Sequence, residues 1–110
     1  MSKNRVVIIG GGAAGLMAAS RARLHADEVT VIERNRICGR KLRITGKGRC
    51  NITNIADTDE IMDNITSNRK FMYSALGALS NYDVIALMED LGVATKVERG
   101  GRVFPVSDSA

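Results

Sequence analysis

The chain opens with an unbroken apolar segment instead of an alternating one. Residues 5–9 read Arg-Val-Val-Ile-Ile, with no polar residue among the four β-branched side chains. This pattern is typical of a strand that is buried on both faces of a parallel sheet. Residues 28–33, Glu-Val-Thr-Val-Ile-Glu, predict a second strand.

The segment between these two strands predicts a helix. Glycines fill most of residues 10–15, and residues 13–24 have a helical composition in which Ala14, Met17 and Ala18 recur at helical spacing. A strand, a tight glycine turn, a helix and a strand within about 30 residues form a βαβ unit with a right-handed crossover. We therefore expect an α/β fold in which residues 1–33 form a dinucleotide-binding βαβ unit.

Residues 57–92 show a helical pattern that is broken into three pieces. Candidate N-caps are Asp57 or Thr58 for the first helix, Asn68 for the second and Asn81 for the third, which Gly92 is placed to end. Residues 34–56, by contrast, carry three glycines among basic residues and predict a long loop.

The last part of the chain predicts a β-hairpin over residues 93–106. Two segments, 93–98 and 102–106, flank Gly100-Gly101, which fits a two-residue turn.

The net charge of +4 over 110 residues is concentrated in one stretch. Seven of the 16 basic residues lie between positions 33 and 49, and this stretch contains one acidic residue. The rest of the chain therefore has 9 basic and 11 acidic residues. The seven basic residues are Arg34, Arg36, Arg40, Lys41, Arg43, Lys47 and Arg49. A local positive charge without aromatic residues suits one anionic ligand better than a nucleic-acid track. We expect no nucleic-acid partner, no membrane segment and a cytoplasmic location.

The sequence indicates neither a metal site nor a catalytic group. Cys38 and Cys50 lack metal-ligand or redox-motif spacing, and His25 falls at a predicted helix end where it fits a capping role. The catalytic residues are unknown at this level.

The glycine segment fits the pattern G-x-G-x-x-G, with a physical reason at each position. Gly10 permits a sharp turn, Gly12 lets the backbone approach a pyrophosphate, and Gly15 lets the helix pack close to the strand. The N–H groups of Ala13 and Ala14 in the first helical turn can donate to phosphate oxygens. The strand before the motif and the helix after it make the assignment specific.

Glu33 completes the fingerprint at the end of the second strand, 18 positions after Gly15. A carboxylate there accepts hydrogen bonds from the adenosine ribose hydroxyls and repels a 2′-phosphate, so NADP is disfavoured. FAD and NAD share this ADP-recognising half, and the spacing leaves both open.

The chain resembles the HI0933-like family of bacterial flavoproteins, also called BaiN or aminoacetone-oxidase-like. The resemblance runs from about residue 6 to residue 109, and four segments carry it: residues 6–19, 31–35, 39–54 and 101–105. The most specific is 39–54, Gly-Arg-Lys-Leu-Arg-Ile-Thr-Gly-Lys-Gly-Arg-Cys-Asn-Ile-Thr-Asn. The family usually has glycine where this chain has Lys47.

The resemblance implies FAD bound at the first βαβ unit, together with a further domain in a longer chain. It implies that Arg40 and Lys41 lie near the ribose and pyrophosphate, and that the segment Gly46–Asn51 runs toward the flavin. Arg34, directly after Glu33, joins the predicted cofactor-binding residues.

These observations predict the N-terminal part of a Rossmann-like FAD-binding domain, incomplete in itself. We expect 34–56 to be a basic cofactor loop, 57–92 helices and 93–106 a hairpin. The expected function is an FAD-dependent oxidoreductase of a small organic molecule, with NAD(P)H as a candidate electron donor and 1–110 inactive alone. Reduction of an activated C=C bond and oxidation of an amine are both open. The alternatives are a non-catalytic nucleotide-binding module and an NAD-binding dehydrogenase.

Overall fold

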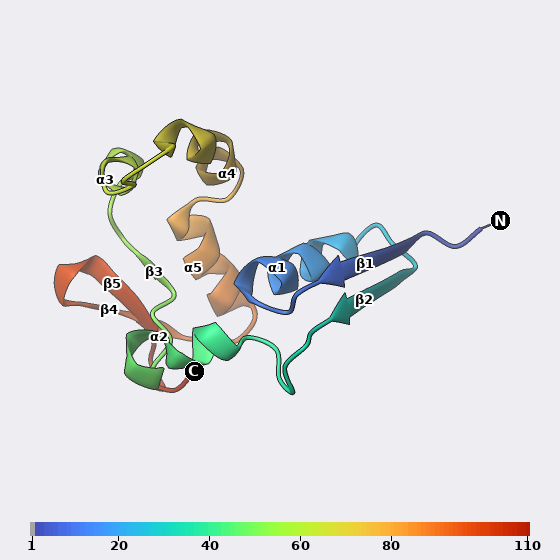
Figure 1. Ribbon diagram of the computed structural model, residues 1–110. Helices are drawn as coiled ribbons and strands as arrows, with labels where there is room; N and C mark the ends of the chain where they lie inside the picture. The colour runs from blue at the N-terminus through green and yellow to red at the C-terminus, as the bar shows by residue number, and fades with distance from the viewer. Residues whose placement is uncertain (1) are drawn as a thin grey trace. The chain divides into compact units, whose positions relative to one another are not determined.

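The computed structural model describes residues 2–110, which form two compact units, one up to Thr45 and the other Gly46–Ala110. The first unit contains β1 (Arg5–Ile9), α1 (Ala13–Ala22) and β2 (Glu28–Ile32). The two strands run parallel (Figure 1). Their residues pair from Arg5 opposite Glu28 to Ile9 opposite Ile32. The predicted α/β fold with a parallel βαβ unit is confirmed.

The pattern of β1 predicts a strand that is buried on both faces in a complete sheet, and within residues 2–110 one face of the β1–β2 pair is exposed. Along β1 and β2 the residues alternate between half-buried and exposed. Val7, Ile9 and Ile32 expose 59%, 77% and 52% of their surface. Successive side chains of a strand point to opposite faces of the sheet, so this alternation means that residues 2–110 cover only one face of the β1–β2 pair. The continuous apolar sequence suits a sheet that is covered on both faces.

The second unit combines short helices with a small antiparallel sheet. Its helical segments are α3 (Thr58–Asp63), η1 (Arg69–Met72), α4 (Tyr73–Ala78) and α5 (Asn81–Asp90). Its strands are β3 (Thr53–Asn54), β4 (Thr95–Glu98) and β5 (Arg102–Pro105), in the order β3-β5-β4. Val103 and Phe104, the residues at the centre of β5, are fully buried.

The caps of these helices differ in part from the predicted ones. Asp57 caps α3 as expected, because its Oδ1 accepts from the N–H of Glu60 at 2.8 Å. Ser80, and not Asn81, caps α5, in a reciprocal capping box with Asp83. Asn68 stands at the N-cap position of η1, as predicted, but it lies in the left-handed region and makes no side-chain cap bond.

Asn81 has a different use. It is 6% exposed, and its amide nitrogen donates to the backbone oxygens of Asn54 at 2.6 Å and Ala56 at 2.8 Å. This buried side chain satisfies one carbonyl at the end of β3 and one just after it, and so fixes α5 against β3 and the segment that follows.

The hairpin of β4 and β5 is closed by three residues, not by the predicted two. Arg99–Gly101 forms a short 3-10 turn, η2, in which Gly100 and Gly101 have φ of +79° and +73°. Three-residue connections with glycine in the left-handed region are a common hairpin type.

The predicted loop over 34–56 contains a helix, α2 (Arg40–Gly48). The sequence pattern did not predict α2, because its glycines are typical of a loop, whereas Gly46 and Gly48 form the end of this helix. Gly46, Lys47 and Gly48 have φ of +57°, +58° and +86°, so the right-handed part ends at Thr45. No helix within residues 2–110 has the length and apolar character needed to cross a membrane.

Candidate functional site

The glycine-rich turn leads directly from β1 into α1. Gly10 has φ of +98°, a conformation that favours glycine, and its N–H donates to the oxygen of Ile32 at 2.8 Å. The start of the turn is therefore tied to the end of β2.

Two further glycines in this turn serve different purposes. A Cβ on Gly15 would lie 1.8 Å from the oxygen of Gly10, so only glycine permits this approach of helix to turn. A Cβ on Gly12 would have nothing within 4 Å, and Gly12 is exposed. Packing within the chain therefore requires glycine at position 15, whereas position 12 borders open space.

The N-terminus of α1 presents unpaired donors beside this space. Gly12 is the N-cap of α1, and among residues 2–110 no acceptor pairs with the N–H groups of Gly12, Ala13 or Ala14. The first N–H groups of a helix have no intrahelical partner and carry the positive end of its dipole. This arrangement can bind an anion such as a phosphate group.

Glu33 links the end of β2 to the same turn. Its Oε2 accepts from the N–H of Asn35 at 2.6 Å, and its Oε1 accepts from the N–H of Gly11 at 3.0 Å. These bonds from Asn35 and Gly11 hold the pKa of the Glu33 carboxyl below its usual value. The side chain is thus a fixed carboxylate with lone pairs left for further donors.

A groove lies at the carboxyl ends of the two parallel strands. It has a volume of about 290 Å³ and is lined by Ile9, Gly10, Ile32, Glu33, Arg34 and Asn35. Open α/β sheets bind their ligands at this edge. Larger hollows of about 450 and 430 Å³ lie in the second unit around Asn54, Ala56 and Glu60, where the sequence predicted no site residue.

Sequence reasoning missed the support that Cys38 and Gly39 give to the glycine turn. The N–H of Gly39 donates to the oxygen of Gly11 at 2.7 Å, and a Cβ on Gly11 would lie 2.6 Å from the Sγ of Cys38. No local pattern signals these contacts, because Gly11 lies 27 positions from Cys38 and 28 positions from Gly39.

The predicted basic residues Arg34, Arg40 and Lys41 are exposed in the first unit. Arg40 donates to the Oδ1 of Asn35 at 3.4 Å, and none of the three forms an ion pair within residues 2–110. Their charges are available to an anionic ligand.

The remaining predicted residues, Gly46 and Asn51, lie in the second unit. A Cβ on Gly46 would lie 2.5 Å from the Cε1 of Phe104, so this glycine is required by packing against the ring. With its amide nitrogen directed to the backbone, Asn51 donates to the oxygens of Thr53 at 3.1 Å and Val103 at 3.3 Å. Both residues therefore have a structural explanation within the unit.

No group of three or more metal-ligating side chains occurs within the described residues. Cys38 and Cys50 are both free thiols.

Comparison with known proteins gives a family and three relatives. Residues 4–110 match the model of the HI0933-like protein Rossmann domain. A 3-dehydro-bile acid delta(4,6)-reductase from Clostridium scindens is 38% identical over 112 aligned residues, covering 97% of this chain and 26% of the relative. Ribosomal RNA dihydrouridine synthases from Haemophilus influenzae and Escherichia coli are 35% and 34% identical, covering 89% and 100% of this chain and 24% and 27% of those proteins.

The chain thus spans about a quarter of the length of these relatives. Two of the three are named for a reaction on ribosomal RNA, so the expectation of no nucleic-acid partner is not supported. The match over residues 4–110 agrees with the parallel βαβ unit and the glycine-rich turn. The chain therefore belongs to the HI0933-like family and carries its Rossmann-type dinucleotide-binding domain.

Proposed function

We propose that this chain holds the ADP half of FAD in an oxidoreductase that reduces a C=C bond conjugated to a carbonyl group. The observation that carries the cofactor assignment is the turn at Gly12. It combines open space where a side chain would stand, three free N–H groups and a carboxylate at the adjoining strand end.

The chain's own residues divide the binding of this cofactor. The N–H groups of Gly12, Ala13 and Ala14 would hold the pyrophosphate, whose negative charge suits the N-terminus of α1. Glu33 would accept from the ribose hydroxyls at the groove, which Arg34 also lines. We assign Arg40, Lys41, Gly46 and Asn51 to the site on family pattern.

FAD in this position would supply hydride to the substrate, and the protein would supply binding and orientation. We choose FAD over NAD because the segment 39–54, the most specific part of the resemblance, resembles the HI0933-like flavoproteins. NAD(P)H is then the proposed electron donor.

The reaction class is supported by the chemistry in the relatives' names. A 3-dehydro-bile acid with delta(4,6) double bonds and a uracil ring both contain a C=C bond conjugated to a carbonyl. Reduction adds hydride to one carbon and a proton to the other. A small enone is the first candidate substrate, and a uracil base in RNA is the second, because two relatives are named for it.

The test uses the whole protein that contains this chain. We expect it to purify with the absorption spectrum of oxidised flavin, to lose this absorption with NADH or NADPH, and to regain it when a 3-oxo-Δ4 steroid or uridine-containing RNA is added without oxygen. Protein that neither carries nor binds FAD would overturn the proposal. Reoxidation by one substrate and not the other would decide between the two candidates.

A further inference from the structure

Within the first unit, Asn35 connects two side chains of opposite charge, Glu33 and Arg40. Its backbone N–H donates to the Oε2 of Glu33 at 2.6 Å, and its Oδ1 accepts from the Nη1 of Arg40 at 3.4 Å. Asn35 is half-buried and lines the groove at the carboxyl ends of β1 and β2. It therefore stands at the groove between a carboxylate and a guanidinium.

The side-chain amide of Asn35 has an orientation that suits both neighbours. The pKa of the Glu33 carboxyl is lowered first by the backbone N–H of Asn35, then by that of Gly11, and the side-chain amide of Asn35 lowers it further. An amide nitrogen only donates hydrogen bonds and an amide oxygen only accepts them. The nitrogen therefore faces the Glu33 carboxylate, while the oxygen faces Arg40.

Arg40 is fixed at its backbone as well as at its head group. Gly39, directly before it, is buried, and its N–H donates to the oxygen of Gly11 at 2.7 Å. The oxygen of Gly39 accepts from the N–H of Arg43 at 3.1 Å, so α2 begins on the glycine turn. The bonds of Gly39 and Asn35 thus place Arg40 beside both the turn and the groove.

The amide of Asn35 keeps the charges of Glu33 and Arg40 apart. A direct ion pair would occupy lone pairs of the carboxylate and donors of the guanidinium. Neither residue forms an ion pair in the part of the chain that the structure describes. Both groups therefore keep positions free for a ligand that carries hydroxyls and phosphates.

We propose that Asn35 is a positioning residue that keeps Arg40 from pairing with Glu33 and directs its guanidinium to the phosphates of the ADP moiety. This inference rests on the proposed function, in which Glu33 accepts from the ribose hydroxyls. Asn35 acts through Arg40, so its removal weakens the ligand only where Arg40 is present.

A double-mutant cycle on FAD affinity in the whole protein tests this dependence, with flavin fluorescence as the signal during reconstitution. Asn35→Ala should weaken binding about fivefold, within the coupling found between contacting residues. It should have almost no effect in an Arg40→Ala protein. In a Lys41→Ala protein its full effect should remain, because the bond of Asn35 goes to Arg40 and not to the next residue.

Asn4→Ala is the matched control. It removes an exposed amide that donates to the oxygen of His25 at 3.3 Å, at the end of β1 opposite the groove, and it should keep the parent affinity. Unchanged affinity in Asn35→Ala, or an equal loss with and without Arg40, would overturn the positioning role.

The nitrogen NMR resonance of the Arg40 Nε needs no flavin and separates the two proposals. We expect it to shift in Asn35→Ala and to move again when Glu33→Gln is added, because the guanidinium then loses its new partner. An unchanged resonance in Asn35→Ala overturns the positioning role. A parent protein that does not bind FAD overturns the proposed function and the ligand part of this inference, and the resonance still decides whether Asn35 holds Arg40.

Discussion

At Glu33, two backbone N–H groups hold a carboxylate at the mouth of the groove. We predict that the protein binds ADP-ribose more tightly than its 2′-phosphate, because the second phosphate would meet this charge. Glu33→Gln should reduce the preference, while Glu28→Gln, at the start of β2 and paired with Arg5, should not. Isothermal titration of both ligands checks this, and equal affinities in the parent would contradict it.

Lys47 offers a second test at the scale of one residue. Its φ of +58° is costly for a residue with a Cβ. We predict that Lys47→Gly raises the free energy of unfolding by about 1 kcal/mol, the left-handed cost less the added backbone freedom of glycine. Lys47→Val should lower it. Urea unfolding measures both, and a Lys47→Gly protein less stable than the parent would contradict this explanation.

At the scale of elements, the sequence predicted those helices, strands and turns that depend on local sequence pattern. The βαβ unit could be predicted because two apolar strands, a glycine turn and a helix follow one another within about 30 residues. Gly92 was correctly predicted to end α5, where it has φ of +86°. These features depend on neighbours in the chain.

Features that depend on distant contacts could not be predicted. The ion pair of Arg49 with Glu98 spans 49 positions. Asn81 was mistaken for a cap because its bonds to the backbone oxygens of Ala56 and Asn54 span 25 and 27 positions. Helix α2 was missed because its glycines were interpreted as loop residues, whereas Gly46 packs on Phe104, 58 positions away.

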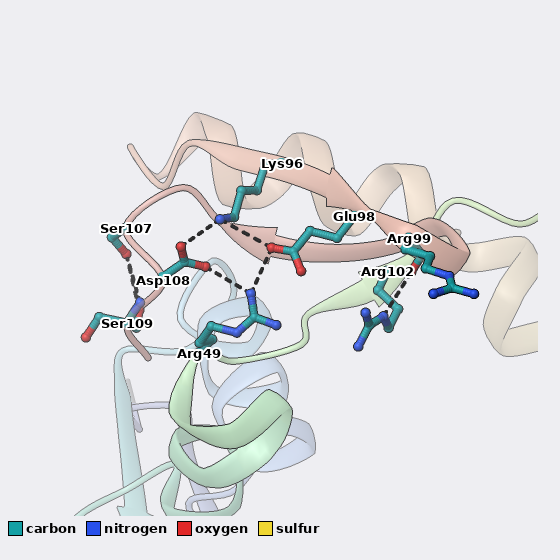
Figure 2. Close-up of polar contacts among 8 residues, drawn as sticks. All are labelled: Arg49, Lys96, Glu98, Arg99, Arg102, Ser107, Asp108 and Ser109. Carbon is teal, nitrogen blue, oxygen red and sulfur yellow. Dashed lines mark hydrogen bonds and ion pairs between the residues drawn. The ribbon is translucent and has the colours of Figure 1, made fainter.

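Ion pairs join Arg49, Lys96, Glu98 and Asp108 around the β4–β5 hairpin (Figure 2) and predict a pH dependence. Lys96 and Arg49 hold the pKa of Asp108 below its usual value, and Arg49 and Lys96 do the same for Glu98. A carboxyl group whose pKa is lowered in the folded protein stabilises the fold at every pH above its ordinary pKa of about 4. This stabilisation is lost as the pH falls through the lowered pKa of the folded state. The pKa values of Arg49 and Lys96 are raised, mainly by the hydrogen bonds to Glu98 and Asp108 respectively, so their part is lost only at strongly alkaline pH.

We therefore predict that Asp108→Asn is less stable than the parent at pH 7 and that this difference narrows below about pH 4. Urea unfolding at both pH values measures it, with Asp63→Asn at the exposed pair of Arg69 and Asp63 as the control. A difference that is the same at pH 7 and pH 3 would contradict the assigned role of these ion pairs.

At the scale of the whole molecule, the β1–β2 sheet presents an exposed apolar face. Val7, Ile9 and Ile32 lie on it. We predict that residues 1–110 expressed alone self-associate and bind FAD weakly, and that Ile9→Lys reduces the association, because exposed apolar strands favour pairing between chains. Sedimentation and flavin titration test this. A monomeric chain with a cooperative melt and tight stoichiometric FAD binding would contradict it.

The central claim is that the turn at Gly12 holds the cofactor's pyrophosphate, and flavin retention in Gly12→Val of the whole protein tests it most directly. A Cβ at position 12 would have no atom of the chain within 4 Å, and loss of the favourable N-cap costs only about 1 kcal/mol. Gly77→Val is the matched control, because a Cβ there also has nothing within 4 Å. We predict that Gly12→Val folds but purifies without flavin, whereas Gly77→Val retains it. Full flavin retention in Gly12→Val would contradict the claim.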